Sequence, residues 1–145
     1  MSLFSAISVS ASGMSAQRQR AELLVENLAN AETTRTAEGG PYRRKDAVFT
    51  SAPVDSPFQS TYASLLGGAS QGVQVSEIAV DTRPPERRYL PGHPDADKDG
   101  YVGMPRINPA EDMVDLMGAS RNYQANVTAM TAVKDMIHRS IDLLK

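Results

Sequence analysis

Apolar and small residues recur at alternating intervals of three and four near the start of the chain. The positions with this spacing are Phe4, Ile7, Ala11, Met14, Ala21, Val25 and Leu28, and Arg18 is the one interruption. Such a heptad pattern is typical of a helix that buries one narrow stripe against other helices. Gly13 weakens this helix, because glycine in a helix interior costs about 1 kcal/mol relative to alanine. We predict an N-terminal helical arm over residues 1–31.

A second heptad pattern occupies the C-terminal part of the chain, residues 108–145. Its seam consists of Met113, Leu116, Ser120, Tyr123, Val127, Met130, Lys134, Ile137, Ile141 and Leu144. Asn108 suits the N-cap, Pro109 suits the first helical position, and Glu111 completes a capping box. With a rise of about 1.5 Å per residue, this helix would be about 50 Å long. We expect the N-terminal helix and copies of both helices from other subunits to cover so long a seam.

The middle of the chain, residues 32–107, holds nearly all the prolines and most of the glycines. Short alternating runs predict strands at Tyr42–Thr50, Gly72–Val80, Arg87–Leu90 and Tyr101–Met104. In the second of these runs the alternation changes phase before its last apolar residues, which indicates a β-bulge. The stretch Ser51–Gln71 is rich in serine, glycine, alanine and proline and predicts a mobile loop. The middle is therefore expected to be a small, loop-rich β region.

The predicted fold class is α+β. Long N- and C-terminal helices, paired like a coiled coil, flank the small β insert. Aromatic residues make up 6% of the sequence and tryptophan is absent, although apolar residues reach 41%. A compact fold with a large aromatic core is therefore not expected, and the β insert should have a thin core.

Charge and cysteine content exclude several classes of function. The formal net charge is −2 and the basic residues are scattered, whereas nucleic acid and anionic membranes require a concentrated positive field. The absence of cysteine excludes disulfides and thiolate metal sites. Two interpretations of this absence stay open. It is chance in a short chain, or it protects a protein that enters an oxidising space from wrong pairing.

The N-terminal segment does not resemble a secretory leader. MSLFSAISVSASG lacks the positive and continuous apolar regions of a Sec signal peptide. The sequence also has no apolar run close to the ~20 residues that span a bilayer. If the protein leaves the cytoplasm, the export route must recognise a different signal.

The segment PDADKDGYVG resembles the start of a calcium-binding loop. Asp95, Asp97 and Asp99 fall at the first, third and fifth positions of such a loop, and Gly100 falls at the sixth. The twelfth position requires a bidentate carboxylate, but Arg106 occupies it. We therefore expect a polar turn between two strands and no metal site.

The sequence contains no recognisable catalytic arrangement. His93 and His138 lie in different regions without a second histidine or cysteine at metal-ligand spacing. No G-x-S-x-G elbow and no glycine-rich phosphate loop is present. We expect no enzyme activity, no cofactor, no metal and no small-molecule substrate.

Two further groups of polar residues invite interpretation. The cluster of Arg43, Arg44 and Lys45 is too small for a nucleic-acid patch, so we interpret it as a charged strand face or as a contact for an acidic neighbour. Asparagines in or beside the helices serve as caps and solvated positions, or as interhelical hydrogen-bonding residues that fix register. The candidates for a register role are Asn30 and Asn126.

These residues carry a likeness to a known family. The run SASGMSAQRQRAELLVENLANAETTRT resembles the signature of bacterial flagellar axial proteins, the rod and hook group. TAEGGPYRRKDAVF, GHPDADKDGYVGMP and EDMVDLMGASRNYQANVTAM are similar to the proximal-rod members of that group. The likeness covers nearly the whole chain except the stretch Ser51–Gln71. Two positions depart from the common pattern: Glu26 replaces an asparagine, and Pro109 replaces a β-branched residue.

The resemblance implies a self-assembling structural subunit. It implies export from the cytoplasm by the flagellar type III apparatus and assembly in the periplasm into a helical tube that surrounds the export channel and transmits torque. The implied partners are other copies of the chain, the rod proteins FlgB, FlgF and FlgG, and the adaptor FliE. The resemblance also implies that the terminal helices line the inner wall. The seam residues named above are then assembly residues.

Two other classes of function are alternatives to a structural subunit. A coiled-coil regulator or chaperone of a secretion system would form a stable free oligomer and would not be exported. An enzyme would require a site that the sequence does not offer.

The aspartate-rich segment gives the first testable prediction. Because Arg106 stands where the bidentate carboxylate is required, calorimetry with millimolar calcium should show no saturable heat. A micromolar dissociation constant that disappears in Asp97→Ala would contradict this interpretation.

Overall fold

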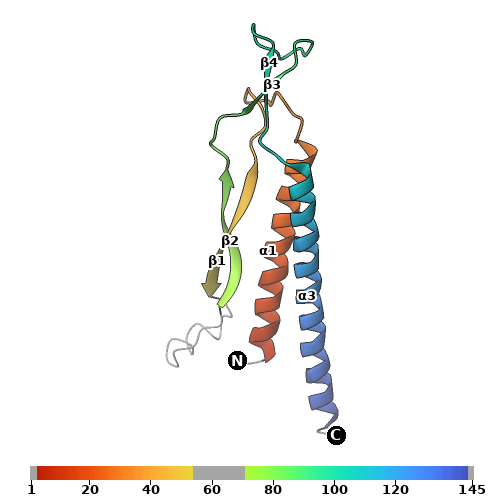
Figure 1. Ribbon diagram of the computed structural model, residues 1–145. Helices are drawn as coiled ribbons and strands as arrows, with labels where there is room; N and C mark the ends of the chain where they lie inside the picture. Colours follow the sequence, from red (N-terminus) through yellow and green to blue (C-terminus); the bar gives the residue numbers. More distant parts are fainter. Residues whose placement is uncertain (1–2, 54–70, 144–145) are drawn as a thin grey trace.

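The structure is a computed structural model that describes residues 3–53 and 71–143 (Figure 1). Its fold is α+β, as the sequence predicts: two long helices precede and follow a small insert of antiparallel strands. The elements in chain order are α1 (Leu3–Ala29), β1 (Lys45–Pro53), β2 (Gln71–Val80), β3 (Glu86–Tyr89), β4 (Tyr101–Met104) and α3 (Pro109–Asp142). The strands form two separate sheets, β1–β2 and β3–β4.

The two helices lie side by side and run antiparallel, so the start of α1 and the end of α3 point to the same end of the molecule (Figure 1). The side chain of Asn108 accepts a hydrogen bond from the backbone N–H of Ala110 at 3.2 Å, which confirms the predicted N-cap of α3. Pro109 takes the first helical position, and Glu111 and Asp112 place negative charge in the first turn, where the helix dipole favours it. Neither described helix is long and apolar enough to cross a membrane.

The hairpin β1–β2 lies along α1 and contains the predicted bulge. The pairs Val48 with Glu77 and Phe49 with Val75 leave Ser76 as an extra residue in β2. The hydroxyl of Ser76 donates to the carbonyl of Val48 at 3.2 Å, so the bulge retains a cross-strand hydrogen bond. A bulge places one extra residue on one strand, which explains why the apolar alternation of β2 changes phase at this point.

The bounds of the first hairpin differ from the prediction at both ends. β1 begins at Lys45 and not at Tyr42, because the backbone N–H of Tyr42 bonds to the carbonyl of Thr33 at 3.0 Å and holds this segment in a turn. β1 then continues to Pro53, which pairs with Gln71. The predicted loop over 51–71 was therefore too long, and its remainder, 54–70, lies outside the described residues.

The aspartate-rich segment forms the predicted polar turn between β3 and β4. Oδ1 of Asp97 accepts from the backbone N–H groups of Asp99 and Tyr101 at 3.0 and 2.8 Å, and Arg87 pairs with Oδ2 at 3.1 Å. Gly100 has φ +81°, and a Cβ there would lie 2.9 Å from the ring of Tyr89. The turn therefore requires glycine for two reasons.

The apolar core is thin, as expected from the composition. Its buried members are Ala16, Leu24, Tyr42, Val102, Ala119 and Val133. They are spread along the helix pair and into the second hairpin and do not form one cluster of large side chains. Three polar residues, Ser5, Asn27 and Asp112, are as deeply buried as this core. Polar interactions therefore hold much of the fold in place.

Candidate functional site

The contact between α1 and α3 uses small residues at its centre. Ala16 on α1 and Ala119 on α3 are almost completely buried. A Cβ placed on Gly13 would lie 3.1 Å from both Oδ1 and Nδ2 of Asn126, which is tighter than an ordinary contact. Gly13 therefore leaves room for the Asn126 side chain of the opposite helix. An intrinsically weak helical residue is tolerated here because it lets α3 approach.

The predicted assembly seam falls into two groups in the structure. The half-buried members are Ile7, Met14, Leu28, Leu116, Met130 and Ile137. The exposed members are Val25, Met113, Tyr123, Val127 and Ile141, each with at least 41% of its surface accessible. The side chain of Phe4 and the whole of Leu144 lie outside the described residues.

On α3 the most buried residues each precede a predicted seam position by one. They are Asp112, Ala119 and Val133, where the seam has Met113, Ser120 and Lys134. One residue corresponds to about 100° around a helix. The apolar seam of α3 is therefore rotated partly away from α1. Its exposed members leave apolar surface that a neighbouring molecule can cover, and their role in assembly stays a prediction.

An apolar groove runs between the two helices on this surface. It is lined by Gln17, Arg18, Ala21, Leu116, Ala119, Ser120 and Tyr123. Oε1 of Gln17 is buried and accepts no hydrogen bond from the described residues. An unpaired buried acceptor of this kind costs free energy of folding.

Asn27 connects the helix pair to the first hairpin. Its side chain is fully buried and makes three hydrogen bonds. Nδ2 donates to the carbonyl of Lys45 at 2.8 Å, while Oδ1 accepts from the N–H of Lys45 at 2.9 Å and from the hydroxyl of Tyr42 at 3.1 Å. The amide thus pairs with the first residue of β1 as a neighbouring strand would.

Charged groups surround this junction. Burial, followed by the negative charge of Glu26, raises the pKa of Tyr42 to about 12, so the hydroxyl stays protonated and donates to Asn27. Glu26 also forms an ion pair with Lys45, whose ammonium group lies over the Tyr42 ring at 5.6 Å. Glu26 therefore contributes to the helix–hairpin contact.

A buried ion pair joins the start of α3 to the same junction. Nη2 of Arg44 lies 3.1 Å from Oδ1 of Asp112, whose side chain is completely buried. The contact lacks the angle of a hydrogen bond, and neither carboxylate oxygen has a hydrogen-bond donor among the described residues. Burial therefore raises the pKa of Asp112, and the charge of Arg44 opposes this shift only in part.

Asn30 and Asn126, the predicted register residues, differ in their surroundings. Asn30 bonds locally, to the carbonyl of Glu26 at 2.9 Å and to the hydroxyl of Thr33 at 3.2 Å. Asn126 donates to the carbonyl of Asn122 at 3.0 Å and packs against Gly13 of the opposite helix. A role in register for either residue stays a prediction.

The described residues contain no group of three or more histidine, cysteine, aspartate or glutamate side chains placed to hold a metal ion. Nδ1 of His93 accepts from the backbone N–H of Asp95 at 3.1 Å, and His138 is exposed on α3. Asp95 itself accepts from the hydroxyl of Thr34 at 2.8 Å. The side chains of His93 and Asp95 therefore make local and loop-to-loop hydrogen bonds.

Comparison with known proteins gives the family. Residues 98–143 match the family described as "Flagellar basal body rod FlgEFG protein C-terminal". The chain is 40% identical to the flagellar basal-body rod protein FlgC of Borreliella burgdorferi, over 100% of this chain and 99% of the relative. It is also 40% identical to FlgC of Bacillus subtilis, over the whole of both chains, and 37% identical to FlgC of Escherichia coli, over 99% and 98%. The chain belongs to the FlgC family.

Sequence reasoning did not single out the residues that join the parts of this FlgC-family chain. Asn27 was one of several asparagines, and its proximity to Leu24 on the buried face of α1 is the signal that could have distinguished it. Asp112 was not considered as a buried residue. Arg44, its partner, was grouped with Arg43 and Lys45, although its side chain is 17% exposed.

The buried ion pair predicts a pH dependence. The pKa of Asp112 is higher in the folded than in the unfolded chain, so its stabilising contribution is complete below the unfolded pKa and is lost as pH rises through the folded pKa. Denaturant titrations from pH 4 to pH 7 should therefore show wild type losing stability relative to Asp112→Asn.

Asp99→Asn provides the control, because it removes an exposed carboxylate from the β3–β4 turn. If the stability difference between wild type and Asp112→Asn stays constant with pH, or changes in favour of wild type as pH rises, burial is not the dominant influence on the pKa of Asp112.

Proposed function

We propose that the chain is a structural subunit of the flagellar basal-body rod that assembles with other rod components. The observation that carries this proposal is the likeness over the whole chain to flagellar basal-body rod proteins FlgC. The same likeness supports location in the flagellar basal body and a structural rather than a catalytic role.

The surface of the helix pair suits assembly. Apolar side chains are exposed along α3 from its start to its end, among them Met113, Val127 and Ile141. Burying such a side chain completely is worth about 1.5–3 kcal/mol, and the gain recurs in every copy. The apolar groove beside Tyr123 offers a second surface for a neighbouring helix.

A more detailed assembly follows from the family resemblance. The subunits form a helical tube around the export channel, with the helix pair towards the inner wall and the hairpins outside, and the tube transmits torque. The partition into an arm of residues 1–31, a middle region of 32–107 and a C-terminal helix of 108–145 matches this arrangement. The first hairpin packs on α1, on the side away from α3 (Figure 1), which supports a placement of this hairpin outside the helix pair.

The neighbours in this proposal are other copies of the chain, FlgB, FlgF, FlgG and FliE. In this proposal the chain reaches the periplasm through the flagellar type III export apparatus. A coiled-coil regulator or chaperone of a secretion system is not favoured, because the relatives over the full length are rod proteins.

The exposed seam of α3 gives a test. Val127→Asp combined with Ile141→Asp should abolish swimming, because each charge would be buried without a partner in every subunit of the wall. Electron microscopy of purified basal bodies should show no complete rod, and cell fractionation should still find the variant outside the cytoplasm.

Ala132→Asp is the matched control, because it adds a charge to an exposed position about 140° around the helix from Val127. Normal swimming by the double variant would place the α3 seam outside the packed wall. Retention of the double variant in the cytoplasm would instead assign the end of α3 to export.

A further inference from the structure

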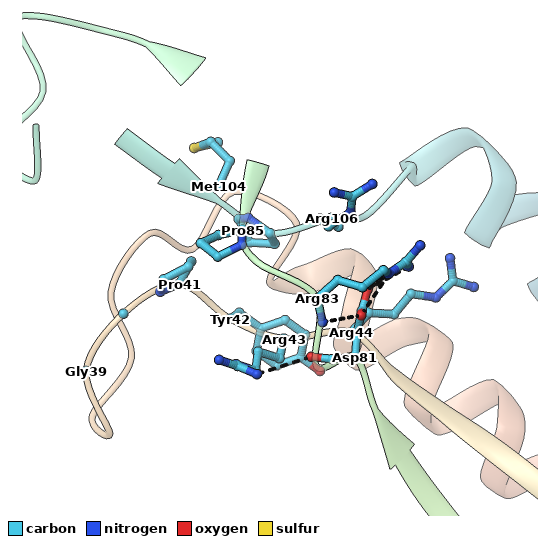
Figure 2. A pocket seen from close by; sticks show the side chains of 12 residues that line it. Gly39, Pro41, Tyr42, Arg43, Arg44, Asp81, Arg83, Pro85, Met104 and Arg106 are labelled. Atoms are coloured by element: carbon cyan, nitrogen blue, oxygen red, sulfur yellow. Dashed lines mark hydrogen bonds and ion pairs between the residues drawn. The ribbon is translucent and has the colours of Figure 1, made fainter. Parts of the chain in front are cut away.

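A basic cleft lies where the first hairpin, the second hairpin and the start of α3 converge. It encloses about 120 Å³. Its apolar walls are Pro41, Tyr42, Pro85, Met104 and Pro105, and its charged members are Arg43, Arg44, Asp81, Arg83 and Arg106 (Figure 2). This concentration of positive charge stands out in a chain whose net charge is −2.

The carboxylate in the cleft neutralises only one of these arginines. Asp81 accepts two hydrogen bonds from Nε of Arg83 and one from Nη2, at 2.9, 3.0 and 2.7 Å. The pKa of Asp81 is lowered to about 2, and these hydrogen bonds are the largest cause. Arg44 is paired with Asp112 and with Asp46, outside the cleft. Asp81 and Arg44 therefore already have ion-pair partners within the chain.

Arg43 and Arg106 remain available to bind a carboxylate from another molecule. The guanidinium group of Arg43 makes one long hydrogen bond, 3.4 Å to the backbone carbonyl of Asp81. Arg106 is exposed and forms no hydrogen bond or ion pair with the described residues (Figure 2). Guanidinium groups bind carboxylates in a bidentate geometry, and the cleft has room for a carboxylate with a few waters.

The same chain carries a surface of opposite charge. A groove between α1 and β2 is lined by Glu22, Glu26 and Glu77 and by the apolar residues Leu23, Val75 and Ile78. Glu26 is paired with Lys45. Glu77 is exposed beside the β2 bulge and forms no ion pair within the described part of the chain. The groove thus presents a free carboxylate flanked by apolar side chains.

We propose that the acidic groove of one copy meets the basic cleft of the next copy, with Glu77 placed against Arg106 and Arg43. This inference rests on the proposed function and specifies one contact between copies. The two surfaces differ and every copy carries both, so the contact is heterologous and continues from subunit to subunit. A nucleic-acid partner would need a larger positive field than this small cleft provides.

A charge exchange tests the contact in a strain that lacks the chromosomal gene. Arg106→Glu alone and Glu77→Arg alone should each lose swimming, and the combined variant should recover it. Arg88→Glu is the matched control, because Arg88 is an exposed arginine on β3 outside the cleft, and this variant should swim normally.

Crosslinking tests the contact without relying on motility. The chain has no cysteine, so Glu77→Cys and Arg106→Cys copies expressed together in one strain carry thiols only at the two chosen positions of this protein. A short bis-maleimide applied to isolated basal bodies should yield crosslinked dimers of the two copies. Replacing Arg106→Cys by Arg88→Cys should abolish the dimers.

The outcomes separate this inference from the proposed function. If the gene deletion leaves rods intact, the proposed function fails. The contact between groove and cleft is wrong, and the rod function stands, if the deletion removes the rod while Arg106→Glu and Glu77→Arg each assemble normally. The same conclusion follows if the combined variant does not recover swimming and no crosslinked dimers form.

Discussion

The fold depends on one buried amide. Both polar groups of the Asn27 side chain form hydrogen bonds with the backbone of Lys45, and the side-chain oxygen also accepts a hydrogen bond from the hydroxyl of Tyr42. Since Lys45 is the first residue of β1, this contact sets where the hairpin begins relative to the helices. Arg44, the residue before it, is thereby held beside Asp112 at the start of α3. Two adjacent residues thus tie the hairpin to both helices.

Such a polar junction is consistent with a chain that buries few large side chains within itself. The helix pair approaches closely through Gly13, Ala16 and Ala119, and the larger apolar residues of α3 stay at its margin or outside. A monomer with this distribution gains little from its own core, whereas an assembly can cover the exposed stripe. Buried hydrogen bonds are strongly directional, so the junction fixes the relative placement of surfaces that must fit neighbouring subunits.

The parts of the fold that arise from local pattern were predictable from the sequence. The two helices, the Asn108 cap, the strands and the β2 bulge each leave a signal within a few residues. The contacts of Asn27 do not, because Lys45 is 18 residues away and a helical asparagine is equally suited to a solvated face. Heptad spacing likewise identifies an apolar stripe on α3, but it cannot say which edge of that stripe faces α1 and which faces another subunit.

Native-state hydrogen exchange of Asn27→Ala tests most directly whether this amide holds the hairpin on the helices. Loss of hydrogen bonds to buried groups costs about 1–3 kcal/mol each, so the Lys45 amide should exchange at least about tenfold faster than in wild type, while the amide of Ala119 keeps its protection. Asn30→Ala, which removes only local bonds, should leave Lys45 unchanged. Unchanged protection of Lys45 in Asn27→Ala, or equal loss at Lys45 and Ala119, would contradict the central role of Asn27.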